Sequence, residues 1–145
     1  MAGVHAGWRG AAAHIAEKTL RRMMAEFGTV PEDVWVYVGP CASACCYEVD
    51  GTVASAFDQR FAAPRKYRID QSGHSGQSDA QEIRYMLDLK AATTAELHGA
   101  GVPATQIDTS PCCTICMPEL FHSHRRDGSR SGRMMAVIGM LHIET

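Results

Sequence analysis

The first ten residues combine chemically active side chains with turn-forming glycines. The segment Val4-His5-Ala6-Gly7-Trp8-Arg9-Gly10 stands directly before a stretch with helical periodicity, so a strand end, a tight turn and a helix start are expected to meet there. Free N–H groups at a helix start and the guanidinium of Arg9 could together bind phosphate or another anion. The alternative is that the glycines only form the turn while Arg9 pairs with a surface carboxylate. His5 on its own is more often an ordinary histidine than a metal ligand.

A second cluster of polar side chains lies near the carboxyl end, in Phe121-His122-Ser123-His124-Arg125-Arg126-Asp127-Gly128. Two arginines beside a serine suit an anionic substrate group, which makes Ser123, Arg125 and Arg126 binding candidates. The alternative is a solvated turn in which Asp127 neutralises an arginine. A hydrolytic serine–histidine pair is not favoured, because the chain contains no G-x-S-x-G segment.

The six cysteines fall into two tight clusters rather than spreading along the chain as a disulfide framework would. The first cluster begins in Gly39-Pro40-Cys41, after a predicted strand, which is where α/β proteins place their sites. Cys41 and Cys45 could in principle join Cys113 and Cys116 in a four-cysteine zinc site. The spacing is loose and only one C-x2-C pair exists, so small buried apolar cysteines are the favoured interpretation.

Length and composition indicate one folded domain over residues 1–145. Apolar residues make up 46% and charged residues 21%, and the formal net charge is −2. This balance excludes a disordered chain, and it gives no overall positive field to attract nucleic acid or a membrane surface. The longest apolar stretch, 134–141, is too short for a membrane helix, and the amino terminus lacks the pattern of a secretory signal. A cytoplasmic location is expected.

Helical and strand patterns alternate along the chain. Helices are predicted over 11–27, after Asp50 with Phe57 and Phe61 on the inner face, and from Asp88 to Gly99. Buried strands are predicted over 34–38 and 133–141, with shorter strands at 67–69 and 106–109. Residues 62–81 are expected to form a long loop. The pattern predicts an α/β sandwich. P-loop, Rossmann, H-E-x-x-H and EF-hand motifs are absent from the sequence.

Several of these blocks, in this order, resemble the carboxyl-terminal part of the YfiH-like laccase-domain family, also called multicopper polyphenol oxidases and regarded as purine nucleoside enzymes. The matching blocks are His5-Ala6-Gly7-Trp8-Arg9-Gly10, Gly39-Pro40-Cys41, Cys46-Tyr47-Glu48-Val49, Asp88-Leu89, Cys113-Thr114 and the segment from Phe121 to Arg133. The resemblance implies a three-layer α/β/α sandwich of the toxin-deamidase type. It also implies phosphorolysis of adenosine, inosine or methylthioadenosine, and deamination of adenosine.

The resemblance further implies site residues. His5 and Arg9 would be catalytic, and Arg125, Arg126, Ser123, Gly39 and Cys41 would bind the nucleoside and phosphate. Family members hold a metal, zinc or possibly copper, with the histidine that matches His5 and with a histidine and a cysteine from V-H-G and T-A-D-C segments. Those two segments are absent from this chain.

The chain is therefore expected to carry half of a site, completed by an amino-terminal half, a second polypeptide or a homo-oligomer. Alternatives stay open at this point. One is a non-catalytic binding or assembly module that pairs through the edge of its sheet. The others are a laccase-like copper oxidase and a module stabilised by zinc on four cysteines.

Overall fold

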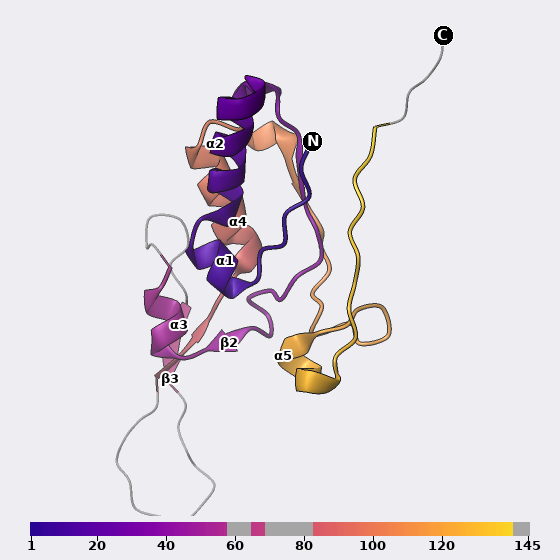
Figure 1. Ribbon diagram of the computed structural model, residues 1–145. Helices are drawn as coiled ribbons and strands as arrows, with labels where there is room; N and C mark the ends of the chain where they lie inside the picture. Colours follow the sequence, from indigo (N-terminus) through magenta and orange to yellow (C-terminus); the bar gives the residue numbers. More distant parts are fainter. Residues whose placement is uncertain (58–64, 69–82, 141–145) are drawn as a thin grey trace, which may run out of the picture.

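The computed structural model describes residues 1–57, 65–68 and 83–140, and these form a mixed α/β structure (Figure 1). The described residues contain two small sheets and five α-helices. The elements of the first half are α1 (Trp8–Ala12), α2 (Ile15–Phe27), η1 (Pro31–Asp33), β1 (Val36–Val38), β2 (Glu48–Val49), α3 (Gly51–Ser55) and β3 (Arg65–Arg68). Those of the second half are β4 (Ile83–Met86), α4 (Leu89–Gly99), η2 (Ala104–Gln106), β5 (Ile107–Thr109), α5 (His124–Asp127) and η3 (Gly128–Arg130).

The first sheet brings two distant segments side by side. β1 and β5 pair in parallel, with Val36 opposite Ile107 and Val38 opposite Thr109. An isolated parallel bridge between Cys41 and Cys113 continues this pairing beyond the strands. The loops that follow β1 and β5 are therefore neighbours, as loops at the carboxyl ends of parallel strands must be. The predicted strand over 106–109 is confirmed.

The second sheet is antiparallel, with the strand order β2-β4-β3. Its strand β3 overlaps the short strand predicted at 67–69, and β4 was not predicted. Other predictions for 62–81 and for Phe61 lie outside the described residues.

The single helix predicted over 11–27 is two helices. His14 adopts a left-handed backbone conformation with φ 58°, which interrupts the helical ladder between α1 and α2. The sequence signal was misleading because the apolar spacing continues through this break. The end of α2 at the left-handed Gly28 matches the predicted stop.

The two predicted aspartate caps are confirmed. The Asp88 carboxylate accepts the Ala91 N–H at 3.0 Å at the start of α4, and the Asp50 carboxylate accepts the Val53 N–H at 2.9 Å at the start of α3. Phe57 is buried, as predicted.

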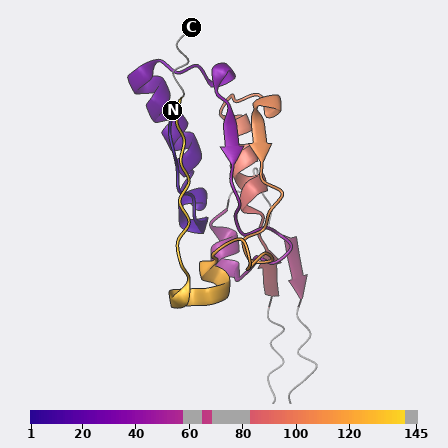
Figure 2. The same cartoon turned by 90° about the vertical axis from the view of Figure 1, so that its right-hand side faces the viewer.

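One face of the β1–β5 sheet is packed and the other is open. Val36 and Ile107 pack against a core formed by Leu20 of α2 with Leu97 and Val102. On the opposite face, Trp35 is 78% exposed and Tyr37 is 64% exposed. The strand predicted over 34–38 is confirmed at Val36–Val38. The prediction that this strand is buried is wrong, since helices cover only one face of the pair (Figure 2).

The predicted strand over 133–141 is also wrong for the residues that the structure describes. Residues 133–140 form no strand and run as an extended trace beyond η3 (Figure 1). Met135, Val137 and Met140 are at least 80% exposed, so the apolar run that predicted a buried strand covers nothing. A strand needs partner strands, which the sequence of one segment cannot reveal. None of the helices in the described part of the chain has both the length and the apolar character of a membrane span.

Candidate anion site and four-cysteine cluster

An open pocket of about 240 Å³ lies where the chain enters α1. His5, Gly7, Trp8, Arg9 and Gly10 line it, so two predicted catalytic residues share one hollow. The His5 ring lies against Gly7, since a Cβ placed there would be 3.5 Å from Nε2. The guanidinium carbon of Arg9 lies 4.3 Å above the Trp8 ring, which holds the positive charge over the indole. Because α1 has five residues, its dipole adds little and the charge of the pocket comes chiefly from Arg9.

Tyr47 connects the two arginine segments that the sequence singled out. Its ring is buried, and the Arg125 guanidinium carbon lies 5.8 Å from the ring centroid. Burial raises the pKa of the Tyr47 phenol, while the positive charges of Arg125 and Arg9 act on it in the opposite direction. The phenol thus stays protonated at neutral pH, within electrostatic reach of both guanidinium groups. Tyr47 was not a sequence candidate, and its place in the Cys46-Tyr47-Glu48-Val49 block is the signal that could have indicated it.

The two neighbouring arginines differ in what they contact. Arg125 is exposed and donates one hydrogen bond to the Glu48 carbonyl at 2.6 Å. Arg126 instead binds within its own segment, donating to the carbonyls of Thr114 at 2.7 Å and Phe121 at 2.9 Å.

Arg126 also forms an ion pair with Asp127 at 2.7 Å. Hydrogen bonds from the Arg126 side chain hold the pKa of the Asp127 carboxyl below its ordinary value. Ser123 is buried, and its hydroxyl accepts the Arg126 N–H at 3.4 Å, capping α5. The donors of Arg126 are therefore occupied by the fold, whereas Arg125 is the arginine that a ligand can reach.

Gly39 and Cys41 lie in the loop after β1, beside the segment that follows β5. The Cys41 carbonyl accepts the Thr114 N–H at 3.1 Å. Burial raises the pKa of the Cys41 thiol to about 11, although the positive charge of Lys90 acts against this. Cys41 is thus a thiol and not a thiolate at neutral pH. A side chain at Gly39 would meet nothing within 4 Å, so this position borders open space.

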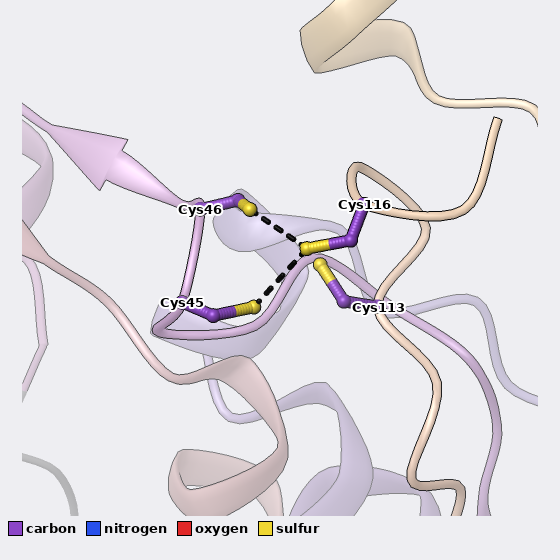
Figure 3. A group of neighbouring side chains, drawn as sticks. All are labelled: Cys45, Cys46, Cys113 and Cys116. Carbon is purple, nitrogen blue, oxygen red and sulfur yellow. Dashed lines mark hydrogen bonds between the residues drawn. The ribbon is translucent and has the colours of Figure 1, made fainter.

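Four cysteines from the two loops meet at one point (Figure 3). Their sulfur atoms all lie within 4.8 Å of one another, and the members are Cys45, Cys46, Cys113 and Cys116. The sequence had grouped Cys41 in place of Cys46. That grouping is wrong, because the Cys41–Cys113 bridge fixes the backbones side by side while Cys46 reaches across to Cys116 at 2.8 Å. This four-cysteine cluster could hold a metal ion.

The thiols of the cluster differ in pKa. Burial raises the pKa of the Cys113 thiol, but hydrogen bonds from the backbone N–H groups of Cys116, Ser43 and Ile115 outweigh burial and lower it to about 6. The hydrogen bond with Cys46 contributes most to raising the pKa of Cys116 to about 11. In the metal-free protein, Cys113 is therefore the thiolate of the group.

A second group of possible ligands, His14, Glu17 and Glu96, links α2 to α4. The buried Glu96 accepts the Glu17 N–H at 2.7 Å and lies 3.7 Å from His14 Nδ1. These contacts bind the start of α2 to α4, so the fold itself accounts for the group. In the described part of the chain, His5 belongs to neither cluster of potential metal ligands.

Comparison with known proteins places the chain in a family. Residues 1–141 match the family model "Multi-copper polyphenol oxidoreductase laccase". The chain belongs to this multi-copper polyphenol oxidoreductase laccase family, which confirms the resemblance noted in the sequence.

Its curated relatives include purine nucleoside phosphorylases. The chain is 38% identical over 137 residues to purine nucleoside phosphorylase YlmD of Geobacillus stearothermophilus, covering 93% of this chain and 46% of the relative. It is 37% identical over 144 residues to a purine nucleoside phosphorylase of Bacteroides thetaiotaomicron, covering 98% and 49%. The chain thus spans about half the length of these relatives.

Solved structures agree with the mixed α/β fold. The crystal structure of YlmD from Geobacillus stearothermophilus matches with a TM-score of 0.71 and 34% identity, over 89% of this chain and 45% of that one. The hypothetical protein YfiH of Bacillus licheniformis matches with a TM-score of 0.67 and 31% identity, over 85% and 43%.

Proposed function

We propose that this chain carries the phosphate-binding half of a purine nucleoside phosphorylase site. The observation that carries the proposal is that two arginines from segments far apart in the sequence lie around Tyr47. The Arg125 guanidinium carbon lies 5.8 Å from the Tyr47 ring, and Arg9 lines the pocket beside Trp8, which packs against the core cluster that contains Tyr47. Two guanidinium groups and a neutral hydroxyl donor match the needs of a phosphate dianion. The named activity of the relatives, purine nucleoside phosphorolysis, requires such a site.

The proposed reaction transfers the ribosyl group to phosphate. A phosphate oxygen forms a bond to C1′ of the ribose as the bond from C1′ to the purine nitrogen breaks, and the departing base takes up a proton. Arg9 and Arg125 would hold the phosphate oxygens, and the protonated Tyr47 would donate a hydrogen bond to one of them. His5, in the same pocket as Arg9, would face the nucleoside. Adenosine, inosine and methylthioadenosine are the proposed substrates, with deamination of adenosine as a further activity.

We propose a structural role in this site for four further residues, Gly39, Cys41, Ser123 and Arg126. Gly39 and Cys41 belong to the loop beside Thr114, and Arg126 ties the Thr114 carbonyl to the segment that carries Arg125. The Ser123 hydroxyl accepts the Arg126 N–H at the start of that segment. The proposed contribution of the four residues is to hold the binding segments in place.

The metal implied by the family is not explained by the described residues. A three-ligand zinc or copper site needs two more ligands close to His5, and His5 lies in no cluster of possible ligands among residues that the structure describes. No step of the proposed reaction is routed through this metal. His5 remains a proposed ligand whose partners would come from outside the described residues.

The test is an assay of inosine and adenosine phosphorolysis, in which the release of free purine is measured. We expect Arg9→Ala, made here and at the matching position of a full-length homologue, to raise the KM for phosphate about tenfold or more, the worth of one charge-assisted contact. Arg21→Ala is the matched control, since Arg21 is exposed and pairs with Glu17 on α2. An unchanged KM for phosphate in Arg9→Ala would remove Arg9 from this role.

A second candidate function is assembly through an exposed apolar surface. Trp35 and Tyr37 are exposed on one face of the β1–β5 sheet, and Val137 and Met140 are exposed in the extended carboxyl segment. Apolar surface of this kind is typical of an interface. If the chain is an assembly module, Val137→Lys should weaken concentration-dependent association in analytical ultracentrifugation. Association without any purine release would favour this function over the enzyme.

A further inference from the structure

We infer that Cys45, Cys46, Cys113 and Cys116 form a tetrathiolate zinc site that ties the loop before β2 to the loop after β5. This site is distinct from a metal at His5 and does not depend on the proposed enzymatic function. Its role is to fix the relative positions of two loops that the Cys41–Cys113 bridge and the hydrogen bond from the Thr114 N–H to the Cys41 carbonyl bring together.

The positions of the sulfur atoms fit a tetrahedral ion. With Zn–S bonds of about 2.3 Å, neighbouring sulfurs of a tetrahedral site lie about 3.8 Å apart. The four sulfurs lie within 4.8 Å of one another, with Cys45 to Cys116 at 3.4 Å and Cys46 to Cys116 at 2.8 Å. The last pair must separate by about 1 Å, which is a small adjustment for side chains on exposed loops. Figure 3 shows Cys45 and Cys46 on one side of Cys116, with Cys113 beside it.

The backbone around Cys113 is arranged to stabilise a metal-bound thiolate. N–H groups of Ile115 and Cys116, two and three residues further along, point at its sulfur, and the Ser43 N–H reaches it from the opposite loop. Hydrogen bonds to a ligand sulfur orient it and spread its negative charge. The C-x2-C spacing of Cys113 and Cys116 is the spacing that structural zinc sites use. Both loops therefore contribute ligands and supporting donors.

The ligand set selects the metal. Four thiolates with no carboxylate or water among them favour zinc, or another thiophilic ion, over magnesium, calcium or manganese. A site closed by four protein ligands leaves no open position for a substrate, so its function is structural. Binding of Zn²⁺ to this group releases the protons that the thiols carry.

The site would stabilise the neighbourhood of the anion pocket. Cys46 immediately precedes Tyr47, and Cys113 immediately precedes Thr114, whose carbonyl accepts a hydrogen bond from Arg126. A bond through the metal would fix the distance between these two segments. The consequence for the protein is higher stability with zinc bound, whatever the reaction is.

The experiment is zinc analysis of protein purified under reducing conditions, with Co²⁺ as a spectroscopic probe. We expect about one zinc per chain, and in the Co²⁺ form the strong visible bands and sulfur charge-transfer absorption of a tetrahedral thiolate site. Cys45→Ser and Cys116→Ser should weaken zinc binding at least about tenfold and lower the Tm by about 5 °C or more. Cys41→Ser and Cys112→Ser are the matched controls, and His5→Ala separates this site from a metal at His5.

Three results would overturn the inference. They are no bound zinc in wild type, zinc bound equally well by Cys116→Ser, and zinc lost equally in Cys41→Ser. If the cluster variants do not fold, two measurements on the wild-type protein test the zinc site. Zinc should then shield four of the six thiols from a thiol reagent, and Co²⁺ should show sulfur charge transfer. Co²⁺ bands without sulfur charge transfer would contradict the site.

Discussion

The sulfur atoms of Cys46 and Cys116 lie 2.8 Å apart, although the two residues are separated by 70 positions in the sequence. The parallel pairing of β1 with β5, continued by the Cys41–Cys113 bridge, brings their loops together. The same pairing places Tyr47 near the segment that carries Arg125. The cysteine cluster and the contact between Tyr47 and Arg125 therefore both depend on the parallel pairing of β1 with β5.

The first prediction concerns oxidation of the metal-free protein. Hydrogen peroxide should form a disulfide within the cluster. The Cys113 thiolate is expected to react first, and Cys116, whose sulfur lies 2.8 Å from that of Cys46 and 3.4 Å from that of Cys45, should be one of the bonded residues. Two thiols lose two protons and two electrons, and peroxide is reduced to water. Peptide mapping by mass spectrometry should find this disulfide, with Cys112 still a thiol. A bond from Cys116 to Cys41 would contradict the described arrangement.

The second prediction concerns the pH dependence of Cys113. Its pKa is lowered to about 6 because backbone hydrogen bonds outweigh the effect of burial, so the folded state favours the thiolate. The resulting stabilisation is complete above the ordinary pKa of 9.0, decreases as the pH falls from 9 to 6, and is absent below 6. Ultraviolet thiolate absorbance of the metal-free protein should show a transition near pH 6. Cys113→Ser should remove it and Cys112→Ser should leave it in place.

The third prediction concerns Glu96 in the contact between α2 and α4. Burial raises its pKa from 4.5, with the Glu17 N–H and His14 acting in the opposite direction. The folded state then favours the protonated carboxyl, so this group makes the protein less stable as the pH rises from 4.5 through the raised value. Glu96→Gln should flatten that part of the curve of unfolding free energy against pH. An exposed control, Glu119→Gln, should reproduce the wild-type curve, and a steep curve in Glu96→Gln would refute the assignment.

The fourth prediction concerns Lys90. Its ammonium donates to the Ser110 carbonyl at 2.6 Å and the Cys112 carbonyl at 3.0 Å, which binds α4 to the loop carrying Cys113. Lys90→Met leaves both partly buried carbonyls without this donor and should lower the free energy of unfolding by about 1–3 kcal/mol. Urea denaturation measures the difference. Lys18→Met, at an exposed position of α2, should change it by less than about 0.5 kcal/mol.

Local signals in the sequence predicted several elements correctly. The caps at Asp50 and Asp88 and the stop at Gly28 act within one turn of their helices, so nearby residues suffice to predict them. His5 and Arg9 stand four positions apart in one turn, and both line the pocket at the start of α1. The family itself was identified from the matching sequence blocks.

Sequence analysis missed or wrongly predicted the features that depend on residues distant in the sequence. The break at His14 leaves the helical spacing of apolar residues intact, so periodicity alone predicts one helix there. Residues 133–140 have the composition of a buried strand but no strand partner among the described residues. Cys46 replaced Cys41 in the cluster because the pairing of β1 with β5 sets which side chains meet, and spacing along the chain does not contain that information.

The central claim is that Arg9 and Arg125 bind phosphate, and phosphate binding measured by isothermal titration calorimetry tests it most directly. Wild type, Arg9→Ala, Arg125→Ala and the control Arg21→Ala should be titrated with inorganic phosphate at constant ionic strength. The account predicts saturable binding in wild type and Arg21→Ala, weakened about tenfold or more in each of the other two variants. Equal binding in all four proteins, or no binding in wild type, would contradict it.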